Sequence, residues 1–243
     1  MTNFFRLFLF IGIVSLISSC EDDDDNMVLP TQFTVTIENV STPQTVATDR
    51  AMGTVPLSPP TWAVFAAGGD PMFEVGQKAN LGTARIAEDG FPDEMLAILG
   101  ADSNVKSFAA QTSPGGPDNG PAVFAGESVT FTVSAVPGDK FQFETMFVQS
   151  NDWFYAFSGG GVELFNGTTP LSGDLTSRVN VYDAGTEQDT APGTGPDQKP
   201  VQDAMATNVG PDEDENIARA ADRHNFTIPA TNSVIKVTIA PGI

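Results

Sequence analysis

The stretch SVTFTVSAVPGDKFQFETMFV, residues 128–148, decides the expected fold of this chain. Apolar and polar residues alternate through 128–136 and again through 140–148, which is the pattern of half-buried strands. The residues between the two runs, 137–139, are Pro, Gly and Asp, which favour a turn. We therefore predict two strands joined as a hairpin.

Further segments with strand character lie on both sides of this pair. The first, 33–38, alternates between apolar and polar residues. The others are short apolar or aromatic runs, at 62–67, 153–157, 162–165, 178–182 and 234–239. About eight short strands separated by turn signals predict an all-β fold, an antiparallel β-sandwich.

Helical character is confined to one insertion. Residues 80–89 end at Gly90, and a second short helix is expected after Pro92, where two acidic residues favour the positive N-terminus. The segments 112–121 and 186–214 are rich in Gly, Pro and Asp and lack periodicity, so we expect loops there.

The N-terminus has the pattern of a bacterial lipoprotein signal. Arg6 precedes an apolar run at 7–17, and two serines lead to Cys20, the only cysteine. The run is shorter than the roughly 20 residues that span a bilayer. We therefore predict a cleaved signal peptide at 1–19 and lipid on Cys20, although an ordinary secretory signal has the same small residues.

The N-terminal signal also predicts the organisation and location of the chain. The acidic residues 20–30 would form a tether, and 31–243 a single domain. An acidic stretch directly after a lipidated cysteine resembles a surface-export signal of some Gram-negative lipoproteins. We expect an exported outer-membrane lipoprotein that is attached through its lipid. The acidic stretch suggests exposure on the cell surface, and a periplasmic orientation stays open as the alternative.

Charge and cysteine content limit the partners and the sources of stability. The chain has 11 Lys and Arg against 31 Asp and Glu, a net charge of −20; without Arg6 the balance is 10 against 31, or −21. This argues against nucleic acid and anionic headgroups as partners, because both require a basic patch. With Cys20 lipidated no disulfide can form, so bound cations are a candidate supplement to core packing.

Most kinds of catalytic centre are hard to build from this composition. The single histidine, His224, is expected on the surface, and the scarcity of Cys and His argues against zinc sites, which need several such ligands. Paired carboxylates could still serve a polysaccharide hydrolase, which stays open as an alternative function. The acidic run 212–215 is expected to be a solvated loop.

Carboxylates lie at two places where expected strands meet turns. Asp152 directly precedes the strand 153–157, while Asp183 and Glu187 follow the strand 178–182, with Gly185 between them free to adopt an unusual backbone angle. Loops at one end of a sandwich converge, so Asp152 and Asp183 can meet. Calcium takes about 6–8 oxygen ligands in flexible geometry. The alternative is that both are turn residues bonded to nearby backbone N–H groups.

The same segments carry a family resemblance. NDWFYAF (151–157) followed by VYDAGTE (181–187) resembles the spondin N-terminal domain of F-spondin and mindin, which has an Asp-Trp pair and then a D-A-G-T-D motif. Further similarity lies in PTWAVF, in GQKANLGTARIAEDG, in the strand pair at 128–149 and in APGTGPDQKPVQ. The similarity covers about residues 31–205.

The resemblance implies a β-sandwich that binds calcium. Asp152, Asp183 and Glu187 would occupy the ligand positions, with Glu187 replacing a family aspartate. The animal relatives are secreted matrix proteins of adhesion and pattern recognition. By analogy we expect a non-catalytic adhesion or binding module with a protein or glycan partner. A structural accessory subunit of an outer-membrane complex is a further alternative.

The aromatic strand 153–157 offers one more candidate site. Trp153, Tyr155 and Phe157 share one face in a strand, and Trp153 and Tyr155 could stack on sugar rings as ligand contacts. The alternative, which large apolar side chains favour, is that they pack in the core.

Overall fold

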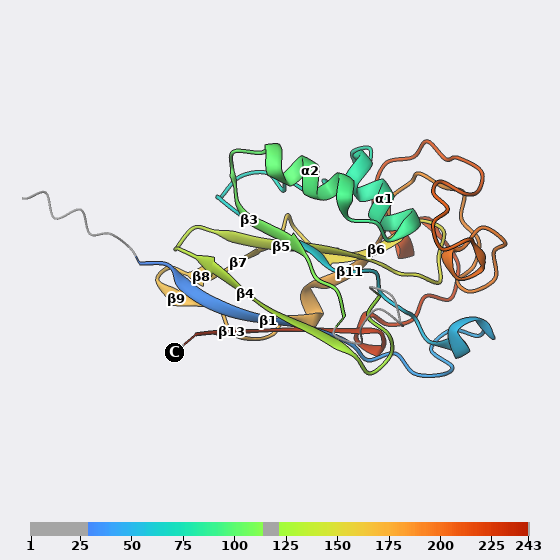
Figure 1. Cartoon of the computed structure of the whole chain (residues 1–243), viewed down its shortest axis with the longest axis horizontal. Coiled ribbons are helices and arrows are strands. Elements are labelled where there is room, and N and C mark those ends of the chain that lie inside the picture. The colour runs from blue at the N-terminus through green and yellow to red at the C-terminus, as the bar shows by residue number, and fades with distance from the viewer. Residues whose placement is uncertain (1–28, 114–121, 243) are drawn as a thin grey trace, which may run out of the picture.

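The computed structural model describes residues 29–113 and 122–242, and two stacked antiparallel sheets form its centre (Figure 1). The smaller sheet has the order β10-β13-β1-β4. Its strands are β1 (Thr31–Asn39), β4 (Ser128–Ala135), β10 (Gly173–Asp174) and β13 (Ile235–Pro241). β1 alternates as expected, because Phe33, Val35 and Ile37 are fully buried while the polar residues between them are partly exposed.

The larger sheet has seven strands in the order β12-β11-β6-β5-β2-β3, with β7 paired to the side of β5. They are β2 (Thr61–Phe65), β3 (Val105–Ala110), β5 (Lys140–Met146), β6 (Trp153–Phe157), β7 (Val162–Glu163), β11 (Val179–Asp183) and β12 (Ala218–Arg219). A separate two-stranded ribbon joins β8 (Phe165–Asn166) to β9 (Thr169–Pro170). All pairings are antiparallel, which confirms the predicted β-sandwich.

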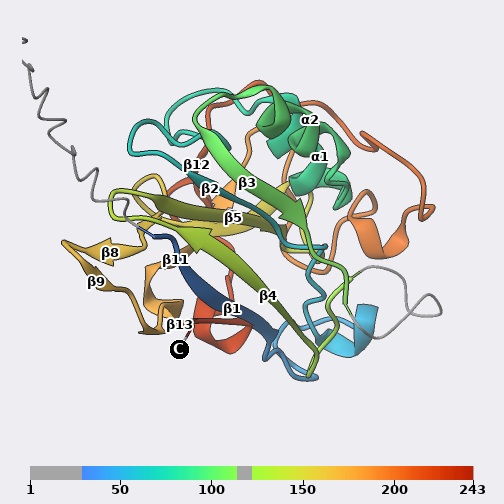
Figure 2. The ribbon, with the colours of Figure 1, turned by 60° about the vertical axis from the view of Figure 1, so that its left-hand side comes forward.

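The helical elements are short. They are α1 (Leu81–Asp89), α2 (Asp93–Ala101) and α3 (Ala220–Arg223), with 3-10 turns η1 (Arg50–Gly53), η2 (Thr176–Arg178), η3 (Lys199–Val201) and η4 (Thr231–Ser233). The predicted start and end of α1 are confirmed: the Asn80 side chain accepts a hydrogen bond from the N–H of Thr83, and Gly90 ends the helix in the left-handed conformation. Figures 1 and 2 show α1 and α2 together on the outer face of the larger sheet.

Two hydrophobic clusters follow from this layering. One lies between the sheets and includes Phe33, Trp62, Phe141 and Tyr155; the other lies under the helices and includes Phe154. The larger sheet is therefore covered on both faces, and every residue of β6 is buried.

The predicted hairpin between 128–136 and 140–148 is wrong. β4 pairs with β1 in the smaller sheet, whereas β5 pairs with β2, β6 and β7 in the larger one. The turn at 137–139 is present, since the N–H of Asp139 donates to the carbonyl of Val136 at 3.0 Å. It carries the chain across the core, where Phe131 of β4 meets Phe141 of β5 at 6.2 Å between ring centroids.

The strand inventory also differs in detail from the expectation. β3 was not predicted, and the run 162–165 is divided between β7 and β8. None of the helices within 29–113 and 122–242 is long and apolar enough to cross a membrane. The predicted signal peptide, Cys20, most of the tether and most of the loop 112–121 lie outside the described residues.

Candidate metal site

Asp152 and Asp183 lie at the same end of the larger sheet. β6 and β11 are antiparallel neighbours, and Asp183, the last residue of β11, is paired in register with Trp153, the first residue of β6. Asp152 therefore stands directly before its strand, where the N–H of Ala184 donates to its carbonyl at 3.1 Å. Both side chains are fully buried. The structure brings these two predicted residues together.

The turn after β11 wraps around the Asp152 carboxylate. Its Oδ2 atom accepts hydrogen bonds from the N–H of Thr186 at 2.7 Å, from the Thr186 hydroxyl at 3.1 Å and from the N–H of Glu187 at 3.0 Å. The other oxygen, Oδ1, is buried without a hydrogen-bond partner. Asp152 Oδ2 thus holds the turn, whereas Oδ1 is an acceptor without a donor.

Gly185 makes this turn sterically feasible. Its φ angle is +70°, and a Cβ atom here would lie 2.7 Å from the carbonyl oxygen of Glu215. The N–H of Gly185 donates to Asp183 Oδ1 at 2.7 Å. The expectation of an unusual backbone angle at Gly185 is confirmed, and the acidic run at 212–215 lies against this turn.

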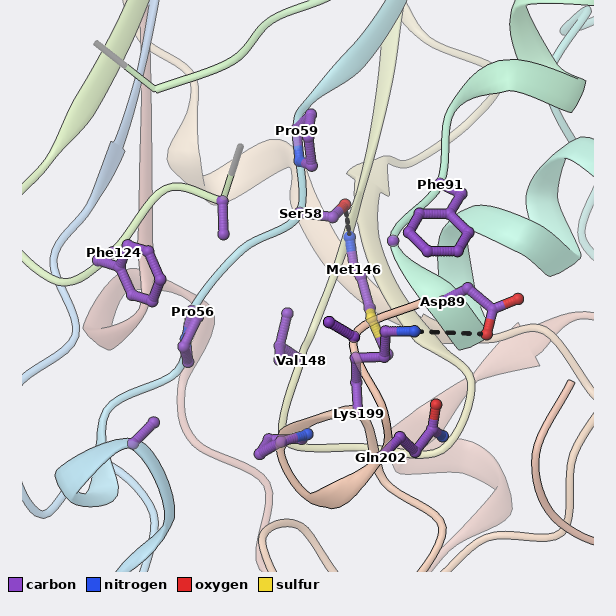
Figure 3. Close-up of a pocket in the computed structure, with 15 residues that line it drawn as sticks. Pro56, Ser58, Pro59, Asp89, Phe91, Phe124, Met146, Val148, Lys199 and Gln202 are labelled. Carbon is purple, nitrogen blue, oxygen red and sulfur yellow. Dashed lines mark hydrogen bonds and ion pairs between the residues drawn. The ribbon is translucent and has the colours of Figure 1, made fainter. Parts of the chain in front are cut away.

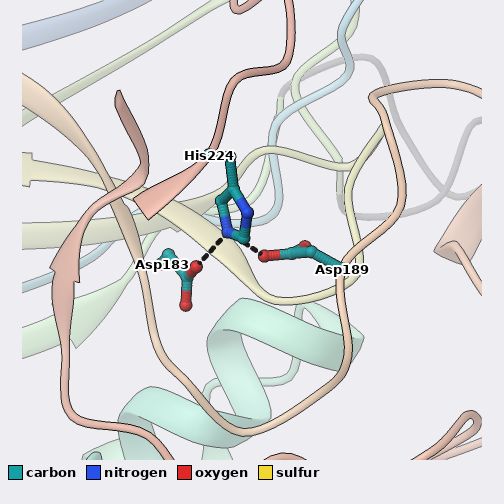
Figure 4. A group of neighbouring side chains, drawn as sticks. All are labelled: Asp183, Asp189 and His224. Carbon is teal, nitrogen blue, oxygen red and sulfur yellow. Dashed lines mark hydrogen bonds and ion pairs between the residues drawn. The ribbon is translucent and has the colours of Figure 1, made fainter. Parts of the chain in front are cut away.

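Asp183, Asp189 and His224 form a compact group beside Asp152 (Figure 4). His224 Nε2 lies 2.6 Å from Asp183 Oδ2 and 2.7 Å from Asp189 Oδ2, and the three side chains are only 14%, 0% and 1% exposed in the order His224, Asp183, Asp189. The indole N–H of Trp153 also donates to Asp189 Oδ2, at 2.8 Å. The Arg223 guanidinium contacts Asp183 Oδ1.

The expectation of a surface histidine is therefore wrong. His224 follows α3, and its ring stacks on Phe226 at 5.0 Å and on Trp153 at 5.6 Å between centroids. These rings shield the imidazole while two carboxylates bind its Nε2 atom. Pairing of an imidazole with buried carboxylates offsets the cost of burying a polar ring.

Glu187 belongs to the turn after β11, where its N–H donates to Asp152 Oδ2. It is 4% exposed, and both carboxylate oxygens are buried without a hydrogen-bond partner. Burial, followed by the charges of Glu88 and Asp152, raises the pKa of Glu187 to about 9. The segment after η3 closes over it, because a Cβ atom on Gly210 would lie 1.9 Å from Glu187 Oε1.

Glu88 reaches the same place from the last turn of α1. It is 3% exposed, and its Oε2 atom has no hydrogen-bond partner, although Arg85 lies 3.6 Å away. Burial is the main reason that its pKa is raised, and the neighbouring charge of Asp89 adds to it. We call the five acidic side chains that converge here the carboxylate cluster: Glu88, Asp152, Asp183, Glu187 and Asp189.

Proximity of like charges shapes the electrostatics of the carboxylate cluster. Burial and the charge of Asp183 raise the pKa of Asp152 to about 7. Burial, then the charges of Asp152 and Asp183, raise the pKa of Asp189 to about 9, against the lowering effect of the Trp153 hydrogen bond. Carboxyl groups in such a place must take up protons or a cation.

The donor set fits a hard cation. Asp152, Glu187, Asp189 and Glu88 each have a buried oxygen atom without a hydrogen-bond partner, and one ligand atom each of Asp183, Asp189 and His224 lies within 4.8 Å of the others. Calcium prefers oxygen ligands of this type and tolerates irregular geometry, whereas magnesium requires near-ideal octahedra. His224 would then orient Asp183 and Asp189, in the way that hydrogen-bond partners hold metal ligands.

Sequence reasoning missed three members of this site. Asp189 lies in a segment without periodicity, Glu88 belongs to a helix of another layer, and His224 is about 40 residues away from Asp183 in the chain. The spacing of Asp183, Glu187 and Asp189 along one short segment was the available signal for Asp189. Nothing in the sequence singled out Glu88.

Trp153 and Tyr155 are not ligand contacts, and that prediction is wrong. Both side chains are fully buried in the cluster between the sheets. Trp153 packs on Phe147 at 5.7 Å and Tyr155 on the same ring at 5.9 Å between centroids. Their aromatic area is used for core packing, because the smaller sheet covers that face of β6.

Comparison with known proteins leaves the family open. A scan against protein-family models gave no match, and neither did a search of curated proteins. The resemblance to the spondin N-terminal domain therefore stays a prediction.

Proposed function

We propose that this chain is a calcium-binding β-sandwich module of the bacterial cell envelope that binds a protein or glycan partner without catalysing a reaction. The observation that carries the proposal is the carboxylate cluster, in which Asp152, Glu187 and Asp189 present buried oxygens without partners. The spondin resemblance supports the same metal, because it implies ligand roles for Asp152, Asp183 and Glu187. Lipid on Cys20 would hold the module at the outer membrane.

Calcium would act by joining separate segments of the fold. Asp152 precedes β6, and Asp183 ends β11. Glu187 and Asp189 lie in the long loop that follows, and Glu88 is the penultimate residue of α1. A divalent cation would neutralise part of their repulsion and restrain the loop. A restrained loop presents a defined surface to a partner, since less conformational entropy is lost on binding.

The test of the metal is the stability of the chain with calcium and with a chelator. Calcium at about 100 times its Kd should stabilise the fold by about 2.7 kcal/mol, and magnesium should do so less. Asp152→Ala and Asp183→Ala should remove the difference. If the melting temperature is the same with calcium and with chelator, the metal part of the proposal fails.

The anchor has its own test. Cys20→Ala should move the chain from the membrane fraction to the soluble fraction and abolish incorporation of a labelled fatty acid. Protease treatment of intact cells should degrade the parent chain if it faces outward. Retention of the Cys20→Ala chain in the membrane would contradict the lipid anchor.

A further inference from the structure

An apolar cavity of about 510 Å³ opens beside the C-terminal end of α1 (Figure 3). Pro56, Phe91, Phe124, Met146 and Val148 line it, with Phe91 and Phe124 on opposite sides. Asp89 and Lys199 stand together at one end. A volume of this size with apolar walls and a few polar groups is typical of binding sites, which are about 300–1,000 Å³.

Exposed apolar side chains occur in the segments that line this apolar cavity. Eight large apolar side chains are exposed in the described part of the chain, and four of them belong to segments that line the cavity. Phe124 is itself in the lining, while Met52, Val201 and Met205 each directly follow a lining residue. Such clustering marks an interaction surface, and methionine suits one because it adapts its shape. We call these four side chains the apolar rim.

Backbone strain accompanies the apolar rim at η1. Ala51 and Met52 have φ angles of +44° and +56°, which is the left-handed region that glycine normally occupies. The neighbouring Gly53 packs too tightly for any side chain, since a Cβ atom there would lie 2.9 Å from the N atom of Gln44. The fold therefore holds Met52 in a costly conformation with 77% of it exposed. Such strain is concentrated at functional surfaces.

Exposed acidic residues without an ion pair occur in the segments that line the cavity, whereas the basic residues of these segments are held by contacts within the fold. Asp49, Asp93 and Asp203 are exposed, each lies within two residues of a lining residue, and none has an ion pair among the described residues. In contrast, Lys199 Nζ donates to the carbonyl of Ala206 at 2.8 Å and lies 3.9 Å from Asp89. Arg50 donates to the carbonyl of Gly195 at 2.6 Å.

We propose that the apolar cavity and its rim dock a partner protein through a segment in which a large apolar side chain is flanked by lysine or arginine. The apolar side chain enters between Phe91 and Phe124, and the flanking cations face Asp49, Asp93 and Asp203. Charge complementarity of this kind favours association with the correct partner. The inference rests on the proposed function, because it names the partner class of the binding module, but it uses a surface outside the carboxylate cluster.

The first experiment measures peptide binding to the full chain as isolated from cells. The probes are short fluorescein-labelled peptides with a central Phe, Leu, Met or Trp flanked by lysines, and fluorescence anisotropy reports the Kd. Matched peptides carry glutamate in place of lysine, or serine in place of the central residue. Both matched sets should bind at least about tenfold more weakly, a difference of about 1.4 kcal/mol. Absence of binding by every lysine-flanked peptide, or equal binding of the matched sets, would overturn the proposal.

Variants of the chain locate the binding. Ala204→Trp places an indole in the cavity from an exposed position, and Met205→Ser removes part of the rim; both should weaken lysine-flanked peptides about tenfold or more. Val75→Ser and Leu81→Ser, which change exposed apolar residues away from the cavity, should leave the Kd unchanged. Unaltered binding by the Ala204→Trp chain, with its melting temperature retained, would place the peptide elsewhere.

Charge reversal gives a gain of function that misfolding cannot imitate. Asp49→Lys together with Asp203→Lys should shift the preference from lysine-flanked to glutamate-flanked peptides, whereas Asp222→Lys on α3 should not. Failure to shift the preference would remove the charge part of the proposal.

Glu187→Gln separates the docking proposal from the metal proposal. If the Glu187→Gln chain loses its calcium response and still binds the peptide, docking is supported. If the parent chain responds to calcium but binds no peptide, docking alone is overturned.

Discussion

Glu144 and the carboxylate cluster are both acidic and both buried, yet their surroundings differ. Glu144 on β5 faces α1 and accepts a hydrogen bond from the Thr83 hydroxyl at 3.2 Å. Burial, together with the charge of Asp70, raises its pKa well above the usual range. A single proton is enough to neutralise a carboxyl group in such a place, so Glu144 needs no cation.

The carboxylate cluster brings five such groups together. Arg223 contacts Asp183, His224 contacts Asp183 and Asp189, and Arg85 stands beside Glu88. Asp152 and Glu187 have no basic partner among the described residues. Neutralising these carboxylates with protons would require several protons. One divalent cation brings two positive charges and would ligate oxygen atoms that have no other partner. Burial alone therefore does not indicate a cation site, because a single buried carboxyl group can be protonated. A candidate cation site is recognised by several buried carboxyl groups that lie together.

The largest effect is expected from Asp183→Ala. This change removes the acceptor of the Gly185 N–H and one of the two carboxylates at His224 Nε2, which keeps Asp189. The partly buried Arg223 loses its only ion pair among the described residues and keeps the carbonyl of Asn216. The free energy of unfolding in chelator should fall by about 3–5 kcal/mol, measured by urea denaturation. Asp222→Ala, on the exposed side of α3, should change it by less than about 0.5 kcal/mol. A loss below about 1 kcal/mol for Asp183→Ala would show that these contacts do not hold the turn.

The pH dependence should show the same contrast. Asp152, Asp189 and Glu187 have folded-state pKa values raised to about 7, 9 and 9, whereas free carboxyl groups titrate near 4. Between these values the folded state binds more protons than the unfolded state. Metal-free stability should therefore be full below about pH 4 for these groups and fall as pH rises towards 9, by about 1.4 kcal/mol per pH unit for each proton.

Thermal melting over a pH series measures this slope. Calcium should flatten it, because the metal replaces the protons in the carboxylate cluster. A metal-free stability that rises between pH 6 and 9 would contradict the raised pKa values of these groups.

Glu187→Gln should affect metal binding more than folding. At neutral pH the raised pKa of Glu187 already keeps the group neutral without metal, so stability in chelator should change by less than about 1 kcal/mol. Calcium affinity, measured by calorimetry, should fall at least about tenfold, which is about 1.4 kcal/mol. Glu215→Gln in the exposed neighbouring run is the control and should keep the parent affinity. Equal calcium affinity in both variants would exclude Glu187 as a ligand.

The smallest effect is expected from Glu144→Gln. The amide has the shape of the protonated acid, and Thr83 can still donate to its oxygen. Stability at neutral pH should change by less than about 1 kcal/mol, and the calcium-induced rise in melting temperature should stay the same. If the Glu144→Gln chain lost its calcium response, Glu144 would contribute to metal binding, and the contrast between Glu144 and the carboxylate cluster would be wrong.

Local patterns predicted which faces are buried, while the partners of strands depended on the whole chain. Alternation in 128–136 and 140–148 correctly placed the apolar side chains in the core. The same alternation is compatible with two strands paired as a hairpin and with two strands in different sheets, because a side chain such as Phe131 is buried in either arrangement. Gln142 and Glu144 are buried as well, since the helices cover the outer face of β5. The local sequence of β5 does not predict that helices pack on this face.

The carboxylate cluster was predictable only where regular structure fixed its geometry. Asp152 and Asp183 meet because neighbouring antiparallel strands bring one strand's start beside the other's end. Asp189 and His224 lie outside regular strands, and their positions depend on the path of the long loop and of α3. Glu88 is placed by the packing of α1 on the sheet, which is a property of the layers.

The last two residues of α1 connect the proposed sites. Glu88 belongs to the carboxylate cluster, Asp89 stands beside Lys199 at the apolar cavity, and Arg85 lies 3.6 Å from the first and 3.0 Å from the second. A cation that draws Glu88 away from Arg85 leaves that guanidinium to Asp89 alone. Thermodynamic reciprocity then applies: whatever factor calcium imposes on peptide affinity, the peptide must impose on calcium affinity.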